Sequence, residues 1–447
     1  MSRLPEVTDG DHERLLVCGV ILPEQSQEFA GALAEAKSLV RAAGASVVGD
    51  DEDLVQRRQR PDASTFLGKG KVEEIKAAIE RHNPTAVMVD NDLSPAQGRN
   101  LEKLLCKRII DRSELILDIF ATRANSRQAR LQVELAQMEY MRPRLKRMWT
   151  HLERTEGAIG SRGPGETQLE TDKRLIAIRI RDLKSRLNEI EARKRRQVVS
   201  RSEVFTVGLV GYTNAGKSTL LNRLTGADVF VADMPFATLD TRTRKWDLGS
   251  GRKALLSDTV GFLQRLPHHL VASFHATLEE ALNVDLLVHV VDGSHPDASD
   301  QMDAVESTLA GLTSRRADLV VLNKMDCLDD PIALQRLRGE REMPFVNLSA
   351  HTGEGIERLE RAVRERFDAR SALVEVRLSV TDGRSVARVR SFGQIKDQRI
   401  EDDTHLVLTL NINEGALAAL ESELKDVAEF SLVEPPSDPY LKDEASA

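Results

Sequence analysis

The stretch of this chain with the clearest chemical meaning reads GxxxxGKS. It consists of Gly211, Tyr212, Thr213, Asn214, Ala215, Gly216, Lys217 and Ser218. An apolar run at 204–210 predicts a buried strand before it, and 218–224 predicts a helix after it, which is the setting that a phosphate-binding loop requires. Backbone N–H groups and the Lys217 charge would hold phosphates, and the Ser218 hydroxyl would reach Mg²⁺. We therefore predict that the chain binds a nucleoside triphosphate.

Short motifs downstream predict which base is bound. A DxxG stands at Asp258, Thr259, Val260 and Gly261, an NKxD at Asn323, Lys324, Met325 and Asp326, and a third group at Ser349, Ala350 and His351. The Asp326 carboxylate offers two acceptors that match the N1–H and N2–H₂ donors of guanine, a donor pair that adenine lacks. The motifs therefore predict GTP and GDP as ligands, with Asp258 holding Mg²⁺ through water.

A loop between the first two motifs is expected to respond to the γ-phosphate. It reads Phe236, Ala237, Thr238, Leu239 and Asp240, and we favour Thr238 over Thr241 or Thr243 as the hydroxyl that touches Mg²⁺. Lys217, Thr238 and Gly261 are the predicted catalytic groups. In Ras-type enzymes a glutamine follows DxxG and orients the attacking water, but here the residue is Phe262. Slow intrinsic hydrolysis that a partner stimulates is therefore expected.

Composition limits the class of protein. The 447 residues predict about three domains, and a 41% hydrophobic and 30% charged composition is typical of a soluble globular chain. The longest apolar run, 15–22, is too short to cross a bilayer, and the N-terminal segment lacks the apolar core of a signal peptide. Three scattered cysteines, Cys18, Cys106 and Cys327, suggest neither zinc nor disulfides. We expect a cytoplasmic monomer with no membrane partner.

The pattern of strand and helix signals predicts a multidomain α/β protein. Residues 1–120 alternate strands (15–22, 86–90) and helices (25–42, 72–81, 95–105), typical of a parallel-sheet α/β domain. Residues 202–368 predict a P-loop GTPase domain with a doubly wound sheet of strands at 204–210, 254–258, 286–292, 318–323 and 344–348. Residues 371–447 predict a small α+β domain with strands at LVEVRLSV, VARVRSF and LVLTLNI, a helix at 414–424 and a disordered tail from Pro435.

Positive charge is concentrated between these domains. Residues 121–201 carry 20 Lys or Arg and 10 Asp or Glu, although the whole chain has a net charge of −8. Apolar residues at spacings of three and four along 131–152 and 169–190 predict two amphipathic helices, the first kinked by Pro143. We expect an antiparallel hairpin whose basic surface meets a polyanion. The glycine-rich segment 155–167 would form a binding loop at its tip, although a plain flexible turn is the alternative.

A second glycine-rich element, GKGK at 68–71, lacks the spacing of a P-loop. It has no GxGxxG pattern either. We therefore interpret it as a loop followed by the start of a helix.

The chain resembles the HflX family of ribosome-associated GTPases. GYTNAGKSTLLN, FATLD, DTVGF, NKMD and, most specifically, GPGETQLE at 163–170 carry the resemblance, together with LILDIFATRA, LQVELAQMEY and FLGKGKVEEI. It covers roughly residues 15–368. The resemblance implies that the protein binds the large ribosomal subunit, that its N-terminal domain and hairpin enter the intersubunit region, and that the GTP form splits stalled or idle ribosomes. The candidate contacts to rRNA are Arg144, Lys146, Arg147, Arg162, Gly163, Gly165, Arg195 and Arg196.

Other functions stay open at this point. A GTPase for ribosome assembly or tRNA modification would combine a helical domain with the same nucleotide-binding fold, although a tRNA-modifying enzyme usually needs a catalytic cysteine or a one-carbon cofactor site that this sequence does not suggest. A non-enzymatic scaffold would bind GTP and signal to a protein. An RNA-remodelling NTPase would unwind RNA with ATP.

Overall fold

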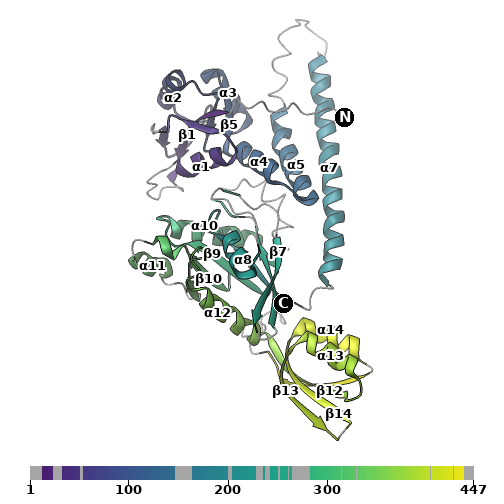
Figure 1. The fold of residues 1–447 in the computed structure, drawn as a ribbon. Helices are drawn as coiled ribbons and strands as arrows, with labels where there is room; N and C mark the ends of the chain where they lie inside the picture. The colour runs from purple at the N-terminus through teal and green to yellow at the C-terminus, as the bar shows by residue number, and fades with distance from the viewer. Residues whose placement is uncertain are drawn as a thin grey trace. The chain divides into compact units, whose positions relative to one another are not determined.

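The computed structural model describes residues 13–436 except 24–32, 51–53, 146–163, 200–203, 228–234, 237–241, 250–251, 260, 264–281, 314, 329–330, 340, 342, 403 and 426 (Figure 1). The chain divides into two compact units. The first is Met1–Glu189 with Ala232–Leu239 and Arg265–Phe274, and the second is Ile190–Val231 with Asp240–Gln264 and His275–Ala447. The predicted tail lies mostly outside the described residues.

The first unit contains a parallel sheet, as the sequence predicts. Its strands are β1 (Arg14–Ile21), β2 (Ser46–Val48), β3 (Val55–Arg57), β4 (Ala86–Val89) and β5 (Arg108–Asp111). The order is β2-β1-β4-β5, with β3 also paired to β1, and every pairing is parallel. All of β4 and most of β1 are buried, which is why these runs are almost entirely apolar.

Helices α1 (Ala34–Ala42), α2 (Lys69–His82) and α3 (Pro95–Leu105) connect these strands. Leu16, Val87, Ile75 and Leu101 meet in their shared core. A capping box begins α3, because the Ser94 hydroxyl accepts from the Gln97 backbone while the Gln97 side chain accepts from Ser94 N–H. The start predicted for the first helix, at 25, lies outside the described residues.

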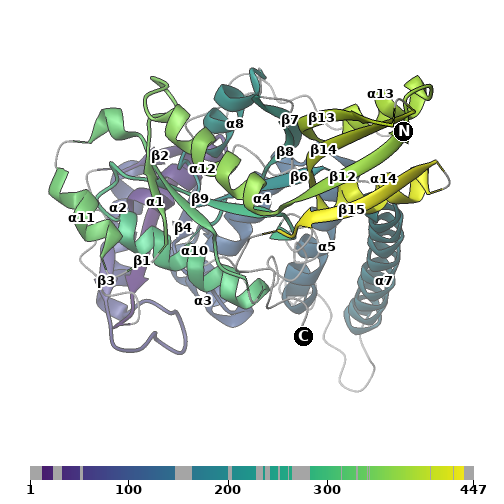
Figure 2. The same ribbon diagram turned by 90° about the horizontal axis from the view of Figure 1, so that it is seen from below.

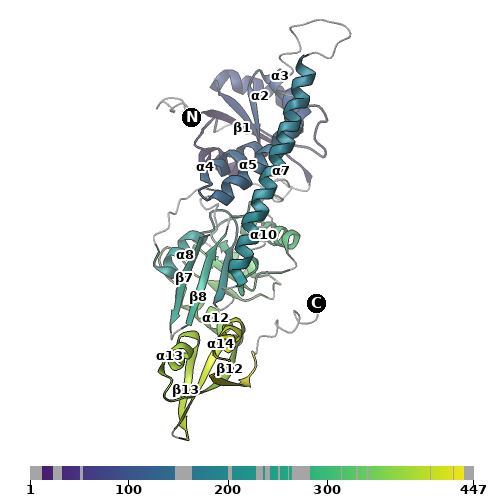
Figure 3. The ribbon, with the colours of Figure 1, turned by 90° about the vertical axis from the view of Figure 1, so that its right-hand side faces the viewer.

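The helical segment consists of α4 (Arg112–Arg123), α5 (Arg127–Met141), the 3₁₀ turn η2 (Arg142–Arg144) and α7 (Pro164–Val199). Helix α5 ends at Met141, just before Pro143, where the sequence predicts an interruption. Helix α7 runs alongside α5 (Figure 3). Ion pairs of 2.6 Å between Arg179 and Glu134 and of 2.8 Å between Lys184 and Glu139 join the two helices. The loop predicted at 155–167 is too long: α7 already begins at Pro164, because proline suits the first turn of a helix.

The nucleotide-binding sheet of the second unit has the order β11-β10-β9-β6-β8-β7. Its strands are β6 (Phe205–Val210), β7 (Arg242–Gly249), β8 (Arg252–Asp258), β9 (Leu286–Asp292), β10 (Leu319–Asn323) and β11 (Phe345–Asn347). Only the pairing of β7 with β8 is antiparallel. The doubly wound sheet is confirmed. Strand β7 was not predicted, because exposed polar residues break its apolar alternation.

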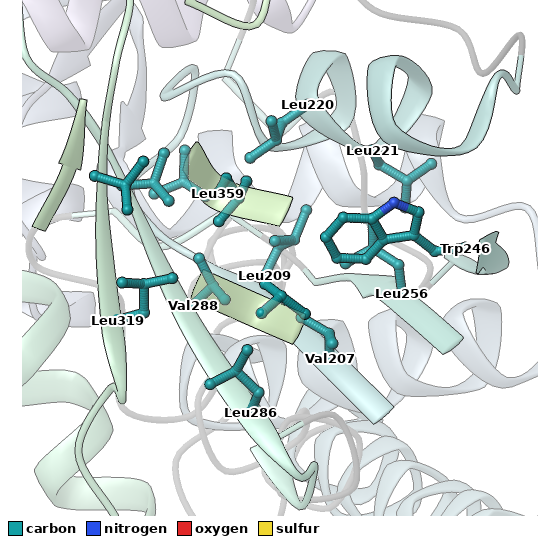
Figure 4. Packing of buried hydrophobic residues seen from close by; sticks show 14 of the residues in the cluster. Val207, Leu209, Leu220, Leu221, Trp246, Leu256, Leu286, Val288, Leu319 and Leu359 are labelled. Carbon is teal, nitrogen blue, oxygen red and sulfur yellow. The ribbon is translucent and has the colours of Figure 1, made fainter. Parts of the chain in front are cut away.

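Two hydrophobic layers cover this sheet. Helices α8 (Lys217–Thr225) and α12 (Ile356–Ala369) contribute Leu220, Leu221 and Leu359 to one layer, which also buries Trp246 of β7 (Figure 4). Helices α10 (Ala298–Leu312) and α11 (Pro331–Arg338) bring Met302 and Leu337 against Val320 of β10 in the other. The strand ends that carry the predicted motifs are thus held by a rigid core.

The C-terminal part is a four-stranded antiparallel sheet with two helices. The strands β12 (Ser371–Ser379), β13 (Gln394–Glu401), β14 (His405–Asn413) and β15 (Ala428–Glu434) have the order β13-β14-β12-β15, visible in Figure 2. The α+β class is confirmed, but the strand predicted at VARVRSF is wrong. That segment is α13 (Gly383–Phe392), because Asp382 caps its first turn by accepting from Ser385 N and Val389 is buried in the core with α14 (Glu414–Leu424).

Candidate nucleotide-binding site

The predicted phosphate loop lies between the end of β6 and the start of α8. Gly211 has φ +153° and Gly216 φ +90°, conformations that favour glycine. Each is also crowded: a Cβ at Gly211 would clash with the Val290 carbonyl, and one at Gly216 would clash with the Asn323 amide. The two glycines of GxxxxGKS are therefore required by the neighbouring strands and loops as well as by the turn itself.

Lys217 turns back over the loop that carries it. Its Nζ donates to Gly211 O at 2.9 Å and to Tyr212 O at 2.7 Å, and only 6% of the residue is exposed. Burial lowers the pKa of Lys217 to about 8, although the nearby Asp258 carboxylate opposes this shift. The Lys217 ammonium group is thus held against two backbone carbonyls of its own loop.

An oxygen-rich pair joins the phosphate loop to the DxxG motif. Ser218 Oγ donates to Asp258 Oδ2 at 2.6 Å, and Asp258 is fully buried at the end of β8. The adjacent Thr259 donates its hydroxyl to Leu209 O at 2.8 Å, and this bond ties the end of β8, where Asp258 stands, to β6. A hydroxyl and a carboxylate are hard oxygen ligands, so this pair fits Mg²⁺.

The DxxG segment is fastened directly onto the phosphate loop. Phe262 N donates to Gly211 O at 3.0 Å, and Phe262 O accepts from Thr213 N at 2.7 Å. Gly261 lies so close that a Cβ would stand 2.9 Å from Thr213 Cγ2 and 3.3 Å from Lys217 Nζ. This pairing could not be predicted from the sequence, because a backbone contact does not depend on a particular residue type. Val260 is outside the described residues.

Asn323 ties together three loops that are far apart in the sequence. Its Nδ2 donates to Ala215 O at 2.9 Å, and its Oδ1 accepts from Ala350 N at 2.9 Å. The side chain is buried, so both of its functional groups are satisfied by protein. Asn323 therefore links the phosphate loop, NKxD and the segment of Ser349–His351.

The predicted base-binding residues gather beside this junction. Lys324, at φ +60°, forms a 2.7 Å ion pair with Asp292 at the end of β9. Asp326 lies in the short turn η3 (Met325–Cys327), where a hydrogen bond from Ser349 is the main cause that lowers its pKa. The nearby His351 acts in the same direction. An ionised Asp326 is the acceptor pair that a guanine edge requires.

Most of the predicted γ-phosphate loop lies outside the described residues. Of Phe236–Asp240 the structure describes only Phe236, which is buried within the first unit with its ring 4.6 Å from that of Phe120, edge to face. Ala237, Thr238, Leu239 and Asp240 lie outside the described residues. Their roles remain predictions.

Of the predicted rRNA contacts, Arg144 is engaged within the protein. Its NH2 donates to Leu93 O at 2.7 Å and pairs with Asp111 at 2.9 Å, and its guanidinium stacks 3.6 Å from the centre of the Tyr140 ring. Only 17% of the side chain is exposed, which indicates a structural role. Lys146, Arg147, Arg162 and Gly163 are outside the described residues. Gly165, Arg195 and Arg196 lie in α7, whose side chains are not described there.

Family models match the chain in three consecutive blocks. "GTP-binding GTPase N-terminal" matches 30–121, "GTP-binding GTPase Middle Region" 123–201, and "50S ribosome-binding GTPase" 206–324. A GTPase HflX of Escherichia coli is 44% identical over 85% of this chain and 89% of its own length. A GTPase HflX of Lacrimispora saccharolytica is 41% identical over 90% and 94%, respectively.

Solved structures give a weaker likeness. A complex of the protein SsGBP with GDP is 25% identical, with a TM-score of 0.44, and covers 79% of this chain and 98% of that one. A GTP-binding protein of Sulfolobus solfataricus in complex with GDP is 23% identical, with a TM-score of 0.40, and covers 78% of this chain and 98% of that one. Among the helices that the structure describes, none is long and apolar enough to cross a membrane.

Proposed function

Since the chain belongs to the HflX family of GTPases and is a GTP hydrolase, we propose that its GTP-bound form binds the large ribosomal subunit and splits or rescues ribosomes. In this proposal the nucleotide controls ribosome binding. The bound triphosphate stabilises the state that binds the ribosome, and hydrolysis to GDP and phosphate lets the protein dissociate. We further propose that the protein acts as a cytoplasmic monomer.

One observation supports the nucleotide part of the proposal above the others. Asn323 joins the phosphate loop to both base-binding loops through hydrogen bonds of 2.9 Å. A ligand that spans the three loops must carry phosphates at one end and a base at the other. Because Asp326 stands at the base end with its pKa lowered, guanine is the base that fits.

The residues suggest how hydrolysis proceeds. Ser218, Thr238 and, through water, Asp258 would hold Mg²⁺, whose positive charge would counter the charge of the phosphates. Lys217 would leave its carbonyl partners and donate to the phosphate oxygens, and the Gly261 backbone N–H would meet the γ-phosphate. The Phe262 ring carries no polar group that could orient the attacking water. We therefore propose a slow turnover of GTP that the ribosome accelerates.

The ribosomal part of the proposal rests on the positive charge of the helical segment and on the match to a family model. The helices α5 and α7 belong to the segment 121–201, which carries twice as many basic as acidic residues. RNA is a polyanion, and its phosphates attract such a surface. A family model described as "50S ribosome-binding GTPase" matches the adjacent nucleotide-binding region.

Co-sedimentation with ribosomal subunits and intact ribosomes tests the proposal. With a non-hydrolysable GTP analogue the protein should sediment with large subunits and convert intact ribosomes into subunits, and with GDP it should stay in the supernatant. Ribosomes should also raise GTP turnover. Equal sedimentation in both nucleotide states, with no stimulation, would exclude the proposed function.

The same assay separates the rival functions. Stimulation by assembly intermediates but not by mature subunits would indicate an assembly role, and a modified nucleoside in tRNA would indicate tRNA modification. Stimulation by a protein alone would indicate a scaffold. Unwinding that requires ATP would indicate an RNA-remodelling enzyme. Lys217→Ala should abolish nucleotide binding or hydrolysis in every case.

A further inference from the structure

Arg223 lies outside the nucleotide-binding motifs but contacts the end of one of them across the fold. It stands in the last turn of α8, the helix that begins at Lys217 of the phosphate loop. Its NH2 donates to Thr352 O at 2.6 Å, across 129 positions of chain. Thr352 directly follows the predicted base-binding segment Ser349–His351. We propose that Arg223 is a positioning residue that holds this segment in the conformation that receives guanine, an inference that rests on the guanine site proposed above.

The Arg223 guanidinium lies directly over Gly353. A Cβ built on Gly353 would clash with the terminal nitrogen of Arg223 and would stand 2.9 Å from Cζ and 3.0 Å from Nε. Gly353 also has φ +92°, a left-handed conformation that favours glycine. The glycine therefore gives the arginine the space to reach the Thr352 carbonyl, so the contact depends on both residue types.

The loop that accepts this hydrogen bond is a tight turn. Ser349 N donates to Glu354 O at 2.9 Å, and Gly353 N donates to Ser349 O at 2.8 Å. Thr352 N donates to Ser349 Oγ at 3.1 Å. Each of these bonds has Ser349 at one end and the far side of the loop at the other. Because Arg223 holds the Thr352 carbonyl, it also restrains Ser349 through this turn.

Ser349 connects the turn to the carboxylate that is expected to contact the base. Its side chain is fully buried, and its hydrogen bond is the main cause that lowers the pKa of Asp326. The Ser349 hydroxyl thus accepts from Thr352 N and donates to Asp326. In the proposed site the backbone N–H groups of 349–351 would face guanine O6. A shift of the turn would therefore disturb both the O6 contact and the orientation of Asp326.

Two side chains hold opposite ends of the base-binding segment. Asn323 Oδ1 accepts from Ala350 N near its start, and Arg223 donates to Thr352 O just past its end. Both lead back to the phosphate loop, since Asn323 Nδ2 donates to Ala215 O and Arg223 lies on the helix that follows this loop. Without Arg223, only Asn323 would join the segment to the phosphate-binding part of the site.

The exposure of Arg223 indicates where its effect should be measured. The residue is exposed, so water competes for its guanidinium and the bond adds little to the free energy of unfolding. A charged donor still forms a stronger hydrogen bond to a carbonyl than a neutral donor does, which suits a contact that orders a surface loop. Loss of the guanidinium should therefore weaken nucleotide binding while leaving the fold intact.

The test uses the full chain and two substitutions of the same arginine. Arg223→Met keeps an unbranched stem without a donor, and Arg223→Lys retains one cationic donor. Arg361→Met, at an exposed position of α12, is the matched control. Competition against a fluorescent GDP gives the affinities for GDP and for inosine diphosphate, which lacks the 2-amino group of guanine. All variants should melt within about 2 °C of wild type.

We expect Arg223→Met to bind GDP about 10-fold more weakly and to prefer GDP over inosine diphosphate by about threefold less than wild type. KM for GTP should rise by a similar factor, while turnover at saturating GTP stays within about twofold, because the chemical groups are untouched. Arg223→Lys should recover most of the affinity, and the control should match wild type.

Unchanged affinity and base preference in Arg223→Met would overturn the inference. Equal losses in Arg223→Met and Arg361→Met would overturn it too, because the effect would then come from surface charge. Asp326→Asn separates this result from the proposed site. If that variant keeps the wild-type base preference, the guanine site itself fails. If it loses the preference and Arg223→Met does not, only the positioning role of Arg223 fails.

Discussion

Phe262 and Tyr212 form a parallel β-bridge, so that the residue after DxxG is a backbone partner of the phosphate loop. Hydrogen bonds to Gly211 O and from Thr213 N make the bridge, and the phenyl ring is only 2% exposed. A side chain held in the interior does not orient water. The substitution of phenylalanine for glutamine therefore changes position 262 from a catalytic contact to an anchor.

The first prediction concerns this anchor. Phe262→Gln should leave the basal turnover within about threefold of wild type, because the backbone bridge still directs the side chain inward. Burying the amide should lower the free energy of unfolding by about 1–3 kcal/mol. Single-turnover GTP hydrolysis and urea unfolding check these results. A tenfold gain in rate would show that position 262 faces the nucleotide.

The second prediction concerns the closeness of Gly261 to the phosphate loop. Gly261→Ala places a Cβ 2.9 Å from Thr213 Cγ2 and 3.0 Å from Thr213 Cα, so the segment must shift. GTP hydrolysis should fall by about 10²-fold, while GDP affinity changes little. Gly311→Ala, in α10 with open space around it, is the matched control and should keep full activity. Equal rates for the two variants would refute the expected contact.

A third prediction concerns base selection. Asp326→Asn replaces one acceptor by an amide donor, which fits a C2 carbonyl better than the amino group of guanine. GTP affinity should fall by at least about 100-fold and XTP affinity should rise above that of wild type. Competition binding with a fluorescent nucleotide measures both. Unchanged preference for GTP would mean that Asp326 does not contact the base.

The fourth prediction follows from the lowered pKa of Lys217, about 8. Phosphate contact favours the charged form, so binding of GTP should take up a proton where free Lys217 is partly neutral. Affinity should therefore fall as pH rises above about 8, by up to tenfold per pH unit. Calorimetry in buffers of different ionisation enthalpy measures the uptake. Lys245→Gln, an exposed site on β7, should retain it, and zero uptake by wild type at pH 8.5, about half a unit above this pKa, would contradict the prediction.

A fifth prediction concerns acid stability. His289 is buried in β9, and burial together with the Lys217 charge lowers its pKa to about 3. The unfolded chain binds this proton near pH 6.5, so the stability contribution is complete above about 6.5 and is lost as pH falls toward 3. His289→Leu should reduce the slope of unfolding free energy against pH by up to about 1.4 kcal/mol per unit.

Urea unfolding at several pH values provides the measurement. His405→Gln, a half-buried site on β14, is the control and should follow the wild-type slope. If His289→Leu and wild type lose stability in parallel between pH 6.5 and 4, the buried imidazole is not the cause.

Local signals predicted most of the fold. The apolar runs of β1, β4, β6 and β9, and the glycine that ends α8, are visible in the sequence because a strand or cap depends on neighbouring residues. The sequence pattern predicted the wrong element where a helix and a strand fit the same spacing of apolar residues. The valines at 386 and 389 and Phe392 suit a helix as well as a strand, and the cap at Asp382 decided for the helix.

The sequence alone determined the chemistry of this protein. GxxxxGKS, DxxG and NKxD predicted phosphates, a metal and guanine, because each motif places its groups within a few residues of chain. Only the tertiary structure decided how these groups are coupled. Asn323 reaches Ala215 across 108 positions, Arg144 turns inward to Asp111, and the Gln56 side chain accepts from Gly68 N at the start of α2. Such contacts depend on the order of strands and the packing between them, which no local spacing encodes.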